Sequence, residues 1–135
     1  MKQWILIAAL GLGLPAGAQT PDAPAAGAQA VFAANCAACH QASGAGIPGA
    51  FPALKGNRFV QADAAPVITT VLMGRGGMPT FAESLDDAQL ALAVSYIRQA
   101  WGNRADEVSA QDVQAARSRA NAPEVVKPEA PANAH

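Results

Sequence analysis

The pentapeptide Cys36-Ala37-Ala38-Cys39-His40 brings together both cysteines of the chain and one of its two histidines. Two cysteines separated by two residues and followed directly by histidine have the spacing of covalent c-type haem attachment. Each thiol can add to one vinyl group of the porphyrin, and the histidine then offers an imidazole nitrogen to the iron. The motif therefore predicts one covalently bound haem c, with His40 as an iron ligand.

Two other uses of this motif are compatible with its spacing alone. A structural zinc site requires four nitrogen or sulfur ligands, whereas the other histidine, His135, belongs to a proline-rich tail. A thioredoxin-like redox pair lies in a βαβ unit, but here the flanking residues are rich in alanine and helical in pattern. A plain disulfide is grouped with that second alternative. Haem attachment is the favoured interpretation.

Residues 1–18 have the pattern of a secretory signal peptide. A lysine follows the initiating methionine, residues 4–14 are apolar, and residues 16–18 (Ala-Gly-Ala) have the small-x-small pattern that precedes a cut. The apolar stretch is about half of the ~20 residues that a membrane span requires. We expect an exported protein without a membrane span, periplasmic in a Gram-negative cell.

The charge balance of the mature chain argues against one class of partner. Removing Lys2 from nine basic residues leaves eight, against ten acidic residues, so the net charge is near −2. A nucleic-acid-binding protein would show a basic stripe or patch. We therefore expect protein partners and no nucleic acid.

Proline and alanine divide the mature chain into four parts. Residues 19–26 are expected to form a flexible leader, residues 27–103 a haem domain, residues 104–116 a C-terminal extension, and residues 117–135 a disordered Ala/Pro-rich tail. The domain contains no alternating strand pattern of useful length. The predicted fold class is all-α, and so small a domain needs a staple such as a covalently bound porphyrin.

Helical patterns occur in three segments of this domain. Residues 28–39 contain no helix breaker and deliver the cysteines, and residues 66–73 begin with a proline suited to the first helical position. Residues 86–101 have the strongest pattern, because Asp86 and Gln89 are spaced as a capping box. The apolar stripe of this last helix is expected to be core.

A second ligand to the iron would decide the chemistry, because a haem with an open position can bind gases or peroxide. His135 is nearly excluded by its place in the tail, which leaves Met73 and Met78. Met73 falls on the last turn of a predicted helix, where methionine commonly fills the core. Met78 follows two glycines and precedes a proline, in a segment that can form a pinned loop. Met78 is the favoured ligand, and Met73 is the alternative.

The chain resembles a class I (mono-haem) cytochrome c in four segments, which are the pentapeptide, Phe51-Pro52-Ala53-Leu54, Gly77-Met78-Pro79 and Tyr96-Ile97-Arg98. It is most similar to the small c-type cytochrome subunits or domains of bacterial periplasmic dehydrogenases and oxidases. The resemblance implies three or more short helices wrapped around one covalently bound haem.

The resemblance also implies roles for residues that the motifs alone do not assign. Phe32 and Tyr96 would meet where the first and last helices cross, and Ala28 replaces the glycine usual at that crossing. The carbonyl of Pro52 would accept a hydrogen bond from the imidazole of His40, and Leu54 would press on the haem. The alternative for Pro52 is a plain turn residue.

The function implied is electron transfer without catalysis, by iron held between His40 and Met78. The expected partners are redox proteins, with a dehydrogenase or the respiratory chain as donor and an oxidase or reductase as acceptor. The protein would be a monomer or a dedicated subunit of one dehydrogenase complex. A haem enzyme or gas sensor with five-coordinate iron is the alternative from another class, although no distal histidine is available for it.

Overall fold

Every regular element is helical in residues 23–122, the part of the chain that the computed structural model describes. The predicted signal peptide and the last part of the predicted tail lie outside this range. The all-α class is confirmed. In chain order the elements are α1 (Ala23–Asn35), α2 (Ala37–His40), α3 (Arg58–Gln61), α4 (Ala64–Met73), α5 (Asp87–Gln99), the 3-10 turn η1 (Ala100–Gly102) and α6 (Ala110–Asn121).

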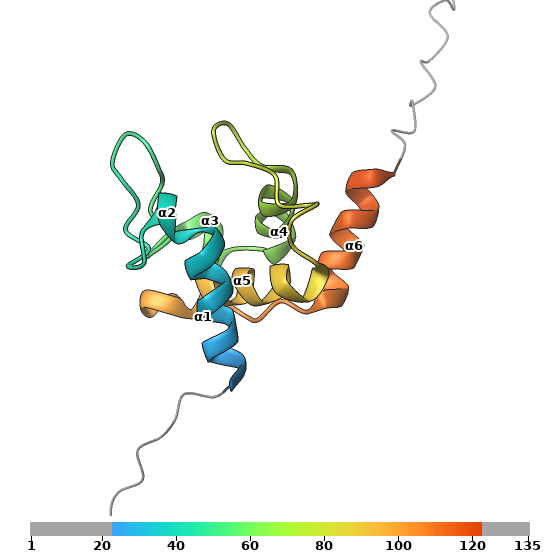
Figure 1. Ribbon diagram of the computed structural model, residues 1–135, viewed down its shortest axis with the longest axis horizontal. Coiled ribbons are helices and arrows are strands. Elements are labelled where there is room, and N and C mark those ends of the chain that lie inside the picture. Colours follow the sequence, from blue (N-terminus) through green and yellow to red (C-terminus); the bar gives the residue numbers. More distant parts are fainter. Residues whose placement is uncertain (1–22, 123–135) are drawn as a thin grey trace, which may run out of the picture.

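Helix α5 is the element against which most of the others pack. Its N-cap Asp86 accepts a hydrogen bond from the backbone N–H of Gln89 at 2.7 Å, and the Gln89 side chain accepts from the Asp86 N–H at 3.1 Å. The predicted capping box is thus confirmed. Helices α1, α4 and α6 all contact α5. Figure 1 shows α1 crossing α5, with α6 beside the N-terminal end of α5.

The crossing of α1 and α5 is built from aromatic side chains. The ring centroids of Phe32 and Tyr96 lie 5.1 Å apart, and Trp101 packs edge-on against them at 5.2 and 5.4 Å. The expected meeting of Phe32 and Tyr96 is confirmed. Ala28 is buried, whereas a Cβ on Gly27 would meet nothing within 4 Å. The crossing therefore accommodates alanine at position 28.

Helix α4 begins two residues before the predicted start. Asp63 is its N-cap and accepts a hydrogen bond from the backbone N–H of Ala65 at 3.2 Å. Pro66 therefore occupies the third helical position rather than the first. Proline is tolerated there because the N–H groups of the first turn have no partner within the helix.

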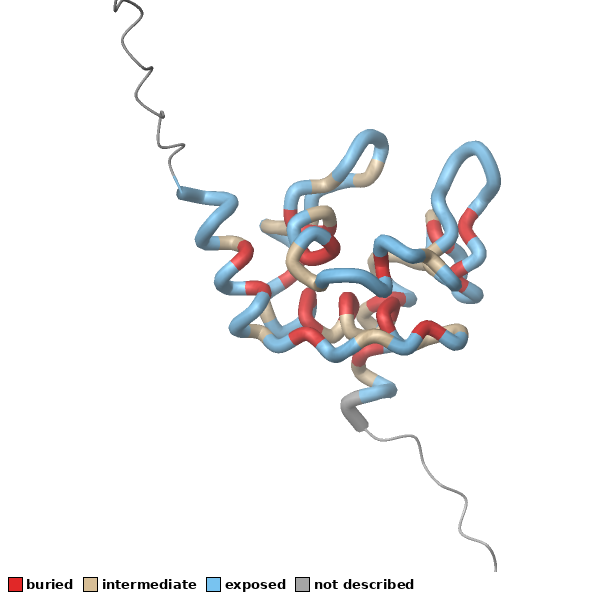
Figure 2. The backbone as a smooth tube through the Cα atoms, turned by 180° about the vertical axis from the view of Figure 1, so that it is seen from behind, coloured by how far each residue is buried: buried red, intermediate tan, exposed pale blue. Residues whose placement is uncertain are grey.

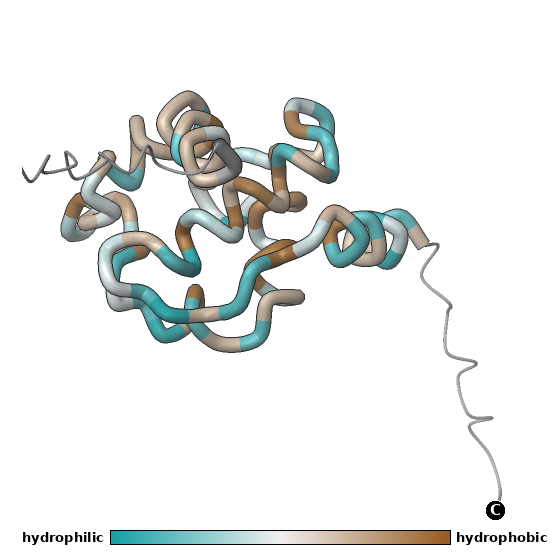
Figure 3. Tube along the Cα trace, turned by 90° about the horizontal axis from the view of Figure 1, so that it is seen from below, coloured by the Kyte–Doolittle hydropathy of each residue, from teal (hydrophilic) through white to brown (hydrophobic). Residues whose placement is uncertain are grey.

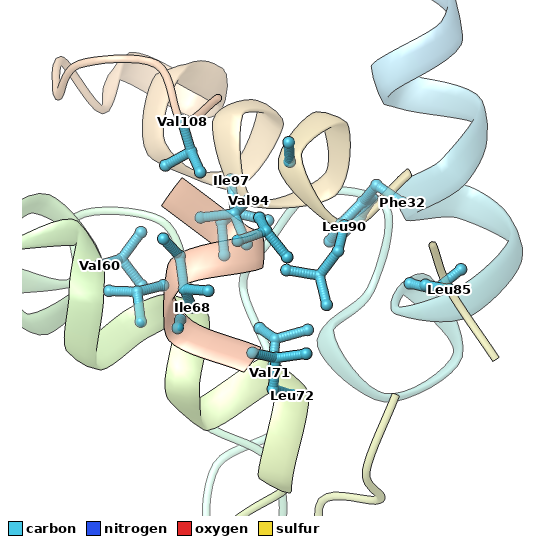
Figure 4. Packing of buried hydrophobic residues seen from close by; sticks show 14 residues of the cluster. Phe32, Val60, Ile68, Val71, Leu72, Leu85, Leu90, Val94, Ile97 and Val108 are labelled. Atoms are coloured by element: carbon cyan, nitrogen blue, oxygen red, sulfur yellow. The ribbon is translucent and has the colours of Figure 1, made fainter. Parts of the chain in front are cut away.

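The hydrophobic core lies where α4, α5 and α6 meet. Figure 4 shows the side chains of α4 and α5 converging on one cluster. Figure 2 shows that buried positions gather on the packed helices, while the long loops are largely exposed. Each fully buried side chain contributes roughly 1.5–3 kcal/mol. The largest of them are Phe32, Ile68, Leu72, Leu90, Val94 and Val113.

Helix α6 was not among the predicted helices, and it corrects a predicted boundary. Residues 117–121, assigned to the disordered tail, are the end of this helix. The leader is corrected in the same way, since residues 23–26 belong to α1. In Figure 3 most of α6 is hydrophilic or intermediate in colour. Its apolar stripe is too thin to stand out, because only Val113 and Ala116 are buried in it.

The segment between α5 and α6 is fastened to the domain by hydrogen bonds. Ser95 Oγ donates to the carbonyl of Val108 at 3.2 Å and accepts from the Val108 N–H at 2.9 Å. The buried guanidinium of Arg98 donates to three backbone carbonyls, those of Val60, Ala62 and Asp106, at 2.8–2.9 Å. The predicted extension 104–116 thus packs as part of the domain.

None of the helices formed by residues 23–122 is both long and apolar enough to cross a membrane.

Candidate haem site

The pentapeptide lies at a break between two helices. The predicted helix over residues 28–39 is interrupted at Cys36, whose φ of −120° leaves the helical region. Helix α2 then resumes, and the His40 N–H donates to the Cys36 carbonyl at 3.0 Å. One tight turn therefore carries Cys36, Cys39 and His40 together.

Both thiols are free and half-buried. Burial, with a smaller contribution from the neighbouring Cys39, raises the pKa of the Cys36 thiol to about 11. Thioredoxin-like pairs show the opposite shift, because their reactive cysteine has a lowered pKa. In residues 23–122, no three His, Cys, Asp or Glu side chains gather closely enough to hold a metal ion. Neither the redox-pair nor the zinc interpretation is supported in this part of the chain.

The His40 ring is buried and held in one orientation. Its Nδ1 atom lies 2.9 Å from the carbonyl oxygen of Pro52. Because a carbonyl can only accept, Nδ1 carries the proton and donates it. Nε2 is then the ring nitrogen available to a metal, because a metal-binding histidine donates its other N–H to such a partner.

The loop of residues 41–56 carries Pro52, and its own backbone holds it to α2. The Gly46 N–H donates to the His40 carbonyl at 3.0 Å. The Gly44 carbonyl accepts from the N–H groups of Leu54 and Lys55 at 2.8 and 3.0 Å. Leu54 is half-buried and packs against the hydrophobic core.

Residues 101–103 fasten this loop from outside. Trp101 Nε1 donates to the Ala42 carbonyl at 3.0 Å. The buried Asn103 side chain donates to the carbonyls of Leu54 and Ile97 at 3.0 and 2.7 Å, and it accepts from the Gly56 N–H at 2.8 Å. Sequence reasoning assigned no role to Asn103. The only available signal was a polar residue beside a helix stop, which does not identify partners nearly fifty positions away.

Met78 lies at the end of a tight turn that follows α4. The Arg75 N–H donates to the Met78 carbonyl at 3.3 Å, and the Met78 N–H donates to the Arg75 carbonyl at 3.0 Å. Gly76, inside the turn, has φ of +58°, a value that glycine adopts without strain. Met78 is half-buried and packs against the core, whereas Met73 is 55% exposed. Met73 is therefore not the core-filling residue that its helix position suggested.

The residues after Met78 are fastened to α4. Thr80 Oγ1 donates to the carbonyl of Leu72, and the Phe81 N–H donates to the carbonyl of Val71 at 3.2 Å. In Figures 1 and 2, residues 41–56 and the segment after α4 project to the same side of the helices. The fold thus directs the Pro52 loop and the Met78 loop to one side.

Residues 23–97 match the family model described as cytochrome c oxidase, cbb3-type, subunit III. The chain belongs to the cytochrome c family. Its cofactor is accordingly haem c, an iron porphyrin held covalently, and electron transfer is the work of the family. The class I cytochrome c fold expected from the motifs is confirmed.

The cytochrome is similar both to a short cytochrome and to parts of longer proteins. It is 37% identical over 78 residues to cytochrome c6 of Leptolyngbya boryana, covering 56% of this chain and 91% of that protein. It is 36% identical over 106 residues to the cytochrome c subunit of alcohol dehydrogenase (quinone) from Gluconobacter oxydans, covering 69% of this chain. The cytochrome spans only 22% of that subunit.

A third relative belongs to an oxidase. The cytochrome is 33% identical over 92 residues to the cbb3-type cytochrome c oxidase subunit CcoP of Azospirillum brasilense, covering 63% of this chain and 31% of that subunit.

Proposed function

We propose that this cytochrome is a one-electron carrier whose haem iron is bound by His40 and Met78. The observation that carries the proposal is the hydrogen bond from His40 Nδ1 to Pro52, at 2.9 Å. That bond determines which tautomer is present, leaves Nε2 free for iron, and prevents rotation of the ring. A buried histidine that binds no metal can form hydrogen bonds within the protein through both of its ring nitrogens.

The donors around His40 suit a covalent porphyrin. Cys36 and Cys39 are free thiols on the same turn as His40. We assign the two thioether bonds to these cysteines.

The apolar surface between His40 and Met78 also suits a porphyrin. In residues 23–122, the large apolar side chains that remain strongly exposed all come from this stretch, namely Ile47, Phe51, Phe59 and Met73. Cofactor sites are lined mainly by apolar and aromatic side chains. Leu54, which joins the core from the same stretch, is assigned to this lining.

Met78 is the better candidate for the second ligand because its surroundings restrain it. Its turn is closed by two backbone hydrogen bonds, and the following residues are fastened to α4. Met73 is on the exposed last turn of α4. A restrained ligand keeps the same position in both oxidation states, which keeps the reorganisation energy of electron transfer low.

The haem supplies the one-electron couple, and the protein's residues hold its ligands and keep water away. A thioether ligand favours the reduced state relative to a second imidazole and so raises the potential. With both ligand positions taken, substrates have no access to the metal. This supports an electron carrier over a five-coordinate enzyme or gas sensor.

The relatives and the signal-like residues 1–18 support a proposal for the partners and the location. Relatives named as subunits of a dehydrogenase and of an oxidase support a dehydrogenase or respiratory-chain donor and an oxidase or reductase acceptor. The signal-like residues 1–18 support export to the periplasm. Whether the chain is a free monomer or a dedicated subunit is tested by purification of the native protein: a constant stoichiometry with one dehydrogenase supports the subunit.

The ligand assignment is tested by comparing Met78→Ala with Met73→Ala in the haem-loaded protein. Met78→Ala should abolish the far-red absorption band that arises from a bond between methionine sulfur and ferric iron. It should also lower the reduction potential and allow carbon monoxide to bind at neutral pH. Met73→Ala should leave the band and carbon monoxide binding unchanged, because Met73 is on the last turn of α4, outside the restrained turn that carries Met78. If only Met73→Ala produces the losses, the assignment is wrong. If the unmodified protein lacks the band and binds carbon monoxide readily, the carrier function is wrong.

A further inference from the structure

Arg117 lies on α6, beyond the residues 23–97 that match the family model. Its guanidinium contacts two carbonyls of the segment that connects Met78 to α5, and the carboxylate of the first residue of α5. Nε donates to Asp87 Oδ1 at 2.8 Å, one terminal nitrogen donates to the Ala82 carbonyl, and the other donates to the Leu85 carbonyl at 3.1 Å. One side chain thus joins two points of this segment to the start of α5.

The backbone hydrogen bonds that residues 82–85 of this segment form are local. The N–H groups of Ser84 and Leu85 both donate to the Phe81 carbonyl, at 3.3 and 3.1 Å. The carbonyls of Ala82 and Leu85 each accept a hydrogen bond from Arg117.

Helix α6 presents Arg117 from a fixed position. Ser109 and Asp112 form a capping box at its start, and Val113 and Ala116 are buried against the core. The helix contacts both α4 and α5. The Arg117 side chain is only 25% exposed, so its hydrogen bonds are partly shielded from water.

We propose that Arg117 is a positioning residue for the Met78 ligand. It ties the segment after Met78 to α5 and α6, while Thr80 and Phe81 tie its beginning to α4. The C-terminal extension then restrains the methionine loop, and releasing Arg117 lets that loop open without unfolding the domain. This inference rests on the proposed assignment of Met78 as the second ligand.

The experiment measures how tightly imidazole binds the ferric, haem-loaded protein. Exogenous imidazole binds only when Met78 leaves, so its apparent affinity reports the fraction of open loops. The variants are Arg117→Gln, which removes the charge and most donors, and Arg117→Lys, which keeps the charge. Arg119→Gln is the matched control, because Arg119 is exposed on the same helix. Far-UV circular dichroism confirms that each variant is folded under the assay conditions.

We expect Arg117→Gln to bind imidazole about tenfold more tightly than the unmodified protein, because hydrogen bonds to a charged group are among the stronger ones. Arg117→Lys should fall between the two, and Arg119→Gln should match the unmodified protein. An affinity for Arg117→Gln equal to that of Arg119→Gln overturns the inference. Met78→Ala separates the two proposals: if it leaves imidazole binding unchanged, the ligand assignment itself has failed.

Discussion

The indole ring of Trp101 lies directly against Gly44, so closely that a Cβ on Gly44 would be 2.5 Å from a ring carbon. The Trp101 ring also donates to the neighbouring Ala42 carbonyl at 3.0 Å. Gly44 in turn accepts from Leu54 and Lys55 through its carbonyl. The aromatic crossing of α1 and α5 is therefore joined to the loop that orients His40.

Gly44→Ala should destabilise the protein more than Gly49→Ala. Both glycines have positive φ, +66° and +79°, so both variants incur the backbone cost of about 1–2 kcal/mol. Only Gly44→Ala also displaces Trp101, since a Cβ on Gly49 would meet nothing within 4 Å. That displacement should add about 1–3 kcal/mol, measured by urea unfolding of the haem-loaded protein. Equal losses of unfolding free energy in the two variants would show that the contact with Trp101 does not contribute to stability.

Gly74→Ala should disturb the Met78 turn, whereas Gly77→Ala should not. A Cβ on Gly74 would lie 2.5 Å from the Met78 carbonyl oxygen, and the φ of Gly74 is +73°. A Cβ on Gly77 would meet nothing within 4 Å. We expect Gly74→Ala to lose about 2–4 kcal/mol of stability and to weaken the far-red band, and Gly77→Ala to change stability by less than about 0.5 kcal/mol. An intact band in Gly74→Ala would contradict the strain argument.

Asn103→Ala should loosen the loop that carries Pro52. The substitution removes three hydrogen bonds, although the Leu54 carbonyl keeps a longer one from the Asn57 N–H at 3.3 Å. Losing three buried or partly buried hydrogen bonds makes the expected loss about 2–4 kcal/mol in urea unfolding. The amide hydrogen of Gly56 should exchange faster with solvent, as followed by NMR. Ala substituted for the exposed Gln99 is the control and should leave that exchange rate unchanged.

The start of α6 should weaken in acid through Asp112. The Ser109 hydroxyl, and then the Ser109 backbone N–H, hold the pKa of the Asp112 carboxyl below its ordinary value of 3.8. A lowered pKa means that the carboxylate stabilises the folded state above pH 3.8, and that this stabilisation disappears as the pH falls through the folded-state pKa. An NMR titration should find the Asp112 pKa below 3.8 and should find it raised in Ser109→Ala. An unchanged pKa in that variant would show that the capping box does not control it.

Local features could be predicted from the sequence because their partners are close along the chain. The capping box of α5 joins Asp86 to a residue three positions away. The start of α4 was misplaced by two residues because only Pro66 was used as the start signal, whereas the side chain of Asp63 caps the helix two residues before the predicted start. Helix α6 was missed because its stability comes from packing rather than from its own apolar pattern.

The sequence by itself determined the chemistry of the site: two thiols and an imidazole within five residues, and a methionine in a glycine-rich turn, are properties of residue type and spacing. The tertiary structure decided how those groups are held. Hydrogen bonds join Trp101 to Ala42, Asn103 to Gly56 and Arg117 to Ala82, across separations of 59, 47 and 35 residues. No local propensity encodes such contacts, because they exist only once the helices have packed and brought a donor to one particular carbonyl or amide.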